Sequence, residues 1–240
     1  MWFWFAVIAL LCWSGSDLFS KIGCQDEKDK YSHLKMVTAV GIVMGLHAAY
    51  EIFIGGVEIN LEVILTYLPV SALYIVSMAV GYLGLRYIEL SISSPICNSS
   101  GAIVAVLTII TVGIGDEVPP VALVAVALVC IGVIGLGFTE ANEDEELRRA
   151  RQDASNRHYA KSWIAIFIPI VYCLLDALGT FADSRVLEII NEDSANVAYE
   201  LTFLVVGLVS LFYVTVVKKQ RLVAKQEAPK YTGAIFETIG

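Results

Sequence analysis

The chain has 240 residues, of which 57% are hydrophobic and only 17% are charged. Soluble domains average about 25% charged residues, so this chain has too few polar side chains to coat a body exposed to water, and its composition predicts a membrane protein. The net charge of −8 argues against a nucleic-acid partner, because phosphate binding needs a clustered cationic surface.

Seven apolar stretches are long enough to cross a bilayer, which takes about 20 residues of helix. The three clearest lie between Glu62 and Arg86, between Glu89 and Asp116, and between Glu117 and Glu140. The other four cover about 2–22, 35–55, 162–186 and 195–217. The sequence therefore predicts an all-α integral membrane protein with about seven transmembrane helices, and the apolar residues 231–240 predict the start of an eighth.

Two charged segments are expected to lie in water. Residues 23–34 predict a short loop, and residues 140–161 predict a longer connecting loop. In the longer loop, the Asp144/Arg148 and Glu145/Arg149 pairs favour a solvated helix because residues four apart meet on one face.

The distribution of lysine and arginine predicts the orientation in the membrane. Fifteen of the sixteen basic residues fall on one side of the predicted spans, and Arg185 alone falls on the other. Since basic residues favour the cytoplasmic side, we expect an outside N-terminus and a cytoplasmic 140–161 loop in a multi-pass protein of the cell membrane.

The five cysteines have neither a C-x-x-C pair nor the spacing of metal ligands. They stand mostly in apolar runs and are expected to be small buried side chains. Neither a metal, a cofactor nor a catalytic residue is predicted. Three glycines of the fifth span, Gly132, Gly135 and Gly137, predict close helix packing.

Two stretches carry a family resemblance. The first span reads WFAVIALLCWSGSDLFSKIG, and the stretch 86–138 holds an apolar helix that ends in Gly115-Asp116-Glu117, turns at Pro119-Pro120 and re-enters as a Gly-rich helix. Over about 2–139, the chain resembles the EamA-type transporters of the drug/metabolite transporter superfamily. Their half-repeat is five helices with a Gly-x-Glu-type turn between the fourth and fifth.

The resemblance implies two such halves in inverted orientation. Trp163 opens a span as Trp2 opens the first, and Ser184-Arg185-Val186 stands where Ser20-Lys21-Ile22 does. The expected units are a first five-helix repeat over 1–139, the connecting loop 140–161 and an incomplete second repeat over 162–240. Compared with the ten-helix plan of the family, the second repeat lacks its last helices, so the resemblance implies a fragment whose competence in transport is open. The family's usual inside N-terminus is opposite to the orientation that the basic residues predict.

Acidic residues inside the spans are the main functional signal. A carboxylate at the bilayer centre costs about 2.5–3.5 kcal/mol on insertion scales, so it has to face protein or water. Asp17, Glu51, Asp176 and Glu200 stand in the first, second, sixth and seventh spans, which are corresponding pairs of the two halves. This distribution is typical of inverted repeats that build one shared polar site.

Structural interpretations compete with this one. Asp17 precedes Lys21 by one helical turn and can pair with it, and Glu200 follows a predicted Ser194 cap, where the helix dipole favours acids. Asp176 has no basic residue three or four positions away. It therefore has to protonate, find a partner on another helix or face water.

A substrate or ion path is predicted from six residues: Trp13, Asp17, Asn98, Asp176, Thr180 and Glu200. Asn98 has donors and an acceptor with few neighbours in its span to satisfy them. Thr180 extends the polar face of Asp176 by one turn. Trp13 is either an interfacial anchor or a wall of the path.

The predicted function is secondary transport of a small metabolite by alternating access, with proton or ion coupling left open. No phosphate-binding loop of the G-x-x-x-x-G-K type is present in the sequence, so we do not expect this chain to be driven by ATP. The alternative is a seven-helix receptor or binding protein without transport activity. An enzyme is disfavoured because His47 is the only histidine in a span and has no partner at metal-ligand spacing. The substrate, the direction of transport and the oligomeric state, including a homodimer, stay open.

Overall fold

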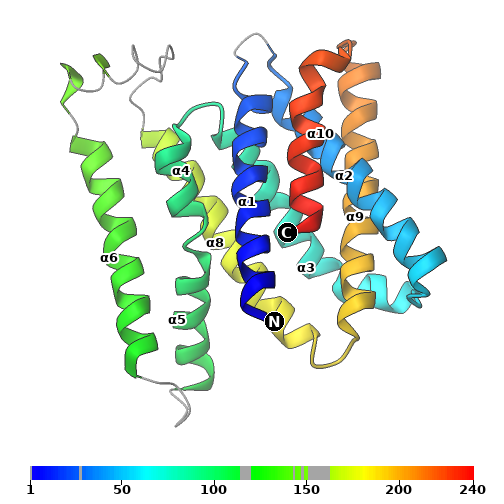
Figure 1. Cartoon of the computed structure of the whole chain (residues 1–240), viewed down its shortest axis with the longest axis horizontal. Coiled ribbons are helices and arrows are strands. Elements are labelled where there is room, and N and C mark those ends of the chain that lie inside the picture. The colour runs from blue at the N-terminus through cyan, green and yellow to red at the C-terminus, as the bar shows by residue number, and fades with distance from the viewer. Residues whose placement is uncertain (1, 27–28, 114–119, 143, 147–148, 151–162) are drawn as a thin grey trace.

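A computed structural model of the chain describes residues 2–26, 29–113, 120–142, 144–146, 149–150 and 163–240. Within these ranges the regular elements are all helices (Figure 1). In chain order they are α1 (Trp2–Cys24), α2 (Ser32–Tyr50), the π-helical turn η1 (Glu51–Gly55), α3 (Leu61–Gly84), α4 (Leu90–Cys97), α5 (Ser100–Val112), α6 (Pro120–Asn142), α8 (Trp163–Val186), α9 (Glu192–Phe212), the π-helical turn η2 (Tyr213–Val217) and α10 (Ala224–Ile239).

Six helical stretches of the described chain are long and apolar enough to cross a membrane. They are Phe3–Cys24, Ser32–Gly55, Leu61–Gly84, Ile92–Thr111, Phe167–Val186 and Glu192–Val217. This confirms the prediction of an all-α, multi-pass membrane protein. The helix predicted between Glu117 and Glu140 is α6, which contributes a shorter apolar stretch over 123–136. Residues 231–240, predicted to start an eighth span, form the end of α10, which packs along α1 and is not among the six stretches.

The predicted fourth span is two helices rather than one. The break between α4 and α5 lies at Asn98-Ser99, shortly after Pro95, whose ring nitrogen has no hydrogen to donate. The Ser99 N–H bonds to the Ile96 carbonyl at 3.2 Å, a tighter turn than an α-helix makes. Irregular backbone at membrane depth is stable only where protein or water can satisfy its polar groups, so the break requires such groups beside it.

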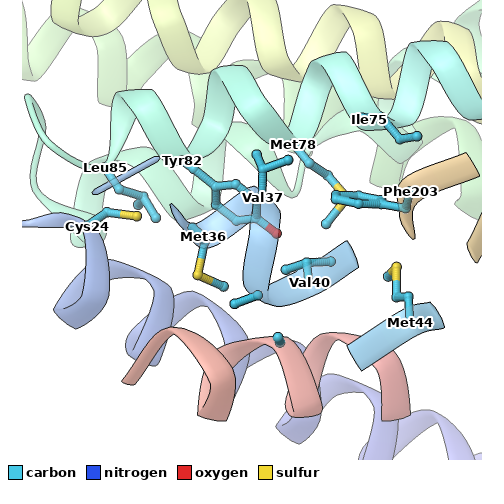
Figure 2. Packing of buried hydrophobic residues seen from close by; sticks show 12 residues of the cluster. Cys24, Met36, Val37, Val40, Met44, Ile75, Met78, Tyr82, Leu85 and Phe203 are labelled. Carbon is cyan, nitrogen blue, oxygen red and sulfur yellow. The ribbon is translucent and has the colours of Figure 1, made fainter. Parts of the chain in front are cut away.

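The centre of the bundle is the crossing of α2 and α9. A Cβ built on Gly41 would lie 2.9 Å from the Cα of Gly207, so the two backbones touch and only glycine fits. Around this crossing, Figure 2 shows the buried side chains of α2 and α3 packing about Phe203 of α9. Phe203 has no exposed surface, and Met78 of α3 and Met44 of α2 lie in the same cluster.

The glycines predicted to allow close packing in α6 do not do so where the structure describes them. A Cβ built on Gly132 or Gly135 would have no atom of another helix within 4 Å. The surroundings of Gly137 are not among those that the structure describes. The prediction was wrong because a glycine-rich stretch permits close approach but does not supply a partner helix. All five cysteines are free, and three of them, Cys12, Cys24 and Cys173, are buried.

Helix contacts occur in matching pairs. α1 packs on α10 as α8 packs on α3, and α2 packs on α10 as α9 packs on α3, while α2 and α9 pack on each other. Both α2 and α9 also end in a single π-helical turn. Gly45 and Gly207 precede these turns by the same number of residues. The contacts between the first three helices and the three from α8 onward are therefore matched.

The predicted 23–34 loop is shorter and less exposed than expected. α1 continues through Cys24 and α2 begins at Ser32, and both residues are fully buried. The Ser32 hydroxyl donates to the Cys24 carbonyl at 2.9 Å. Arg86 donates to the Asp29 carbonyl at 2.5 Å, so the α3–α4 connection closes over this loop.

Charged side chains beside this loop form a buried network. The Lys35 Nζ lies 2.8 Å from an Asp29 carboxylate oxygen and 3.2 Å from Glu227. Lys230 lies 2.9 Å from the other Glu227 oxygen. Buried charges are stable only when they are paired in this way. Because Glu227 and Lys230 of α10 provide such partners, α10 can cover part of the loop that was predicted to lie in water.

The connections α1–α2, α3–α4 and α9–α10 lie at one end of the bundle, and α2–α3 and α8–α9 lie at the other (Figure 1). The basic residues of the described α1–α2, α3–α4 and α9–α10 connections are thus at one end, and Arg185 lies near the other. α6 covers the first residues of the predicted 140–161 connector and ends at Asn142. In the predicted pair of Glu145 and Arg149, the two charged side chains lie 3.5 Å apart and are exposed. Arg148, which belongs to the other predicted pair, lies outside the described residues. Residues 115–119 of the predicted turn between the fourth and fifth spans also lie outside them.

The α2–α9 crossing yields a prediction on stability. Gly41→Ala should lower the apparent Tm of the purified protein, because the added methyl overpacks the contact with Gly207 at a cost of about 1–3 kcal/mol. The matched control is Gly101→Ala, a helical glycine with nothing within 4 Å of its Cβ position. Equal Tm values for the two variants would mean that the crossing is not close in the native protein.

The orientation can be tested at the end of α6. In a chain whose five cysteines are replaced by serine, Asn142→Cys should escape a membrane-impermeant maleimide added to intact cells, since its end of the bundle is predicted to be cytoplasmic. Permeabilised cells provide the control and should be labelled. Ready labelling of intact cells would contradict the orientation predicted from the basic residues.

Candidate functional site

A polar cavity of about 50 Å³ lies among α1, α3, α4, α8 and α10, next to the break in the fourth span. α1 and α4 supply most of its hydroxyl groups, and α3 and α8 supply aromatic rings. Two carboxylic acids line it, Asp17 from α1 and Glu237 from α10. The cavity thus brings together five helices that are far apart in the sequence.

Asp17 is held by the broken helix. Its carboxylate accepts a hydrogen bond from the Ser94 hydroxyl and a longer one, 3.4 Å, from the Asn98 side-chain amide. The same amide donates to the Ser94 carbonyl at 2.9 Å, which fixes its direction. Lys21, the other partner considered for Asp17, directs its Nζ to the carbonyl oxygens of Leu85 and Ile88 at 2.5 and 2.6 Å.

Glu237 enters the cavity from α10 and accepts a hydrogen bond from the Ser16 hydroxyl. Sequence analysis missed this residue because it lies in the segment treated as the start of a span. A signal was available, since Glu237 is an isolated acid in the apolar run 231–240.

Asp176 of α8 lies on the other side of the break, near the start of α5. Its side chain lies close to that of Ser100, the first residue of α5. Asp176 and Asp17 both lie within electrostatic range of Glu237. Asp176 thus lies near a hydroxyl group of another helix, and the three carboxyl groups of Asp17, Asp176 and Glu237 lie near the junction of α4 and α5.

The remaining predicted residues lie elsewhere. The Thr180 hydroxyl accepts a hydrogen bond of 3.1 Å from Tyr74 of α3. Trp13 is 53% exposed, does not line the cavity and lies against the position of a Cβ on Gly240. Of the six residues predicted to form one path, Asp17 and Asn98 line the cavity, and Asp176 lies near Ser100 just beyond the break.

Glu200 belongs to a second polar group, between α2 and α9. One of its oxygens lies 2.8 Å from His47 Nδ1, and His47 Nε2 lies 3.8 Å from Glu51. The predicted Ser194 cap was wrong. Asn191 caps α9, since its side-chain oxygen accepts hydrogen bonds from the backbone N–H groups of Asp193 and Ser194. The Ser194 hydroxyl instead donates to the Glu58 carbonyl. Sequence analysis missed the pairing because one sequence does not show which helices are neighbours.

Within the described chain, no group of three or more His, Cys, Asp and Glu side chains is arranged to hold a metal ion. Comparison with known proteins found no family model, curated protein or solved structure that matches this chain. What the fold and the cavity define is a multi-pass, all-α membrane protein with an acidic polar cavity inside its helix bundle.

The Ser94 hydrogen bond yields a stability prediction. Ser94→Ala should lower the apparent Tm in detergent, because a hydrogen bond to a charged group contributes about 1.5–3 kcal/mol and Asp17 would lose its closer partner. Thr108→Ala is the matched control, since that exposed hydroxyl bonds only to Val104 of its own helix among the described contacts. A Tm loss as small as the control's would contradict the assignment.

Proposed function

We propose that this protein is a secondary transporter of the cell membrane that moves a small metabolite by alternating access. The observation that carries the proposal is the acidic cavity at the broken fourth span, walled by helices from both predicted halves. Transporters bind substrate and coupling ions near the midplane, at discontinuous helices between repeated halves. A cavity in this place is what such a mechanism requires.

The matching helix contacts support an inverted repeat. If α1, α2 and α3 correspond to α8, α9 and α10, the contact of α1 with α10 is equivalent to that of α8 with α3. The contact of α2 with α10 is likewise equivalent to that of α9 with α3. The crossing of α2 and α9 then lies on the axis that relates the halves, as a pseudo-two-fold axis in the membrane plane demands.

We also propose kinship with the EamA-type transporters, on the resemblance of residues 2–139. The structure supports this through the number and order of its helices: five helical stretches precede the connector, the fourth of them broken, and three follow it. A first repeat over 1–139 and a second over 162–240 remain the proposed units.

Alternating access requires contacts at each end that open in turn. Towards the predicted cytoplasmic end, Lys21 ties α1 to the α3–α4 connection and Arg86 ties that connection to Asp29. Towards the other end, Tyr67 donates to Asp183 at 2.6 Å and so joins α3 to α8. The cavity of 50 Å³ holds only a few water molecules, so the structure corresponds to a closed state.

Transport can be tested without knowing the substrate. Proteoliposomes with the full chain are incubated in an extract of small metabolites, and trapped solutes are identified by mass spectrometry. We expect at least one solute to enter only vesicles that contain the protein, and Asp176→Asn to abolish or uncouple its entry, because the carboxylate at the break would be lost.

Asp193→Asn serves as the matched control, since Asp193 is an exposed acid in the first turn of α9 and far from the break in sequence. Equal solute contents with and without the protein would rule out transport. Unchanged entry in Asp176→Asn would remove Asp176 from the path.

A further inference from the structure

We propose that the cavity at the break binds a small organic cation of the alkylammonium type, as the substrate of this transporter. This inference rests on the proposed transport function and names its substrate class. Four properties of the cavity lead to it: charge, unsatisfied hydroxyl groups, apolar lining and size.

The lining has acidic groups and lacks basic ones. Among the described residues that line the cavity, Asp17 and Glu237 are carboxylic acids and none is lysine, arginine or histidine. Asp176 adds a third carboxyl group within electrostatic range of Glu237. The nearby cation Lys21 directs its Nζ to two backbone carbonyl groups. Grouped carboxyl groups in a low-dielectric site favour a cationic guest over a neutral or anionic one.

Two hydroxyl groups in the lining have no partner in the described structure. Ser20 Oγ and Tyr82 OH belong to side chains that are only 2% and 6% exposed, and neither makes a hydrogen bond. Leaving a buried hydroxyl group unsatisfied costs about 1–3 kcal/mol, so such groups in a cavity point to a ligand. An alkylammonium supplies three N–H donors that these oxygens and the carboxylates can accept.

The rest of the lining favours an organic cation over a metal ion. Hard metal cations take a shell of oxygen ligands, whereas this cavity also presents the Met78 thioether, Leu90 and the Tyr172 ring. Alkyl carbons pack against such groups, and an aromatic face attracts an ammonium group. The volume of about 50 Å³ suits a cation of only a few heavy atoms.

Binding can be measured by equilibrium dialysis of the full chain in lipid nanodiscs with radiolabelled ethylammonium. We expect saturable binding, with no binding of radiolabelled propionate. Asp17→Asn and Glu237→Gln should each weaken ethylammonium binding by at least about tenfold, the effect of losing one charged hydrogen bond. Glu51→Gln is the matched control, because Glu51 lies beside His47 outside the cavity lining, and it should bind as the wild type does.

A second measurement uses the unmodified chain, in case an acidic variant fails to fold. Cys97 lines the cavity, whereas Cys130 lines a separate apolar groove between α5, α6 and α8. Peptide mass spectrometry should show that a cationic methanethiosulfonate reagent outpaces an anionic one more strongly at Cys97 than at Cys130. Ethylammonium should also protect Cys97 selectively. Preference for the anionic reagent at Cys97, or no protection, would overturn the proposal.

The outcomes separate this inference from transport itself. If ethylammonium does not bind while other solutes enter proteoliposomes in an Asp176-dependent way, the cation assignment is wrong and transport stands. If ethylammonium binds and Asp17→Asn abolishes that binding, but no solute crosses the membrane, the cavity assignment stands and the proposed transport is wrong.

Discussion

The constraint on which the rest of this structure depends is that a carboxyl group inside a bilayer has to be satisfied by protein. Each acid of the helix bundle interior is satisfied by a different element. Asp17 joins α1 to α4 and Glu237 joins α10 to α1 by hydrogen bonds, while Asp176 of α8 lies close to Ser100 of α5. Without a hydrophobic driving force between helices in lipid, such hydrogen bonds and close backbone packing are what hold a bundle together. The acids thus select which helices become neighbours.

The broken fourth span follows from the same constraint. A continuous helix would occupy its own backbone groups and present side-chain donors at fixed intervals of 3.6 residues. On one side of the turn at Asn98-Ser99, Ser94 and Asn98 face Asp17, and on the other side Ser100 lies close to Asp176. A local loss of regular structure therefore serves two acids on opposite sides. Pro95 and the short polar side chains around it favour such a turn over an unbroken helix.

The features that could be predicted from the sequence are local ones, and those that were missed depend on contacts between distant residues. Span positions were predictable because the bilayer imposes a length on apolar runs, and the acids were visible because they interrupt those runs. The break was not predicted, since an apolar stretch of 26 residues between Glu89 and Asp116 has the length of one long helix. Glu200 with His47 could not be predicted, because the pair joins residues 153 apart in sequence. The close packing of Gly41 also depends on a distant residue, Gly207 of α9, so it could not be predicted from the sequence around Gly41.

The contacts at the α2–α9 crossing differ in kind from those around the cavity. Gly41 and Gly207 bring the backbones of α2 and α9 into contact, and Phe203 is fully enclosed beside them, so this crossing resists separation. The cavity lies on the other side of α3's buried residues, among α1, α3, α4, α8 and α10, and the hydrogen bonds of Asp17 and Glu237 cross it. Single hydrogen bonds each contribute only about 0.5–1.5 kcal/mol net and can be exchanged for bonds to a ligand or water. In the alternating-access mechanism that we propose, the crossing is the fixed contact about which the halves rock, and the carboxyl groups lie where hydrogen bonds are exchanged.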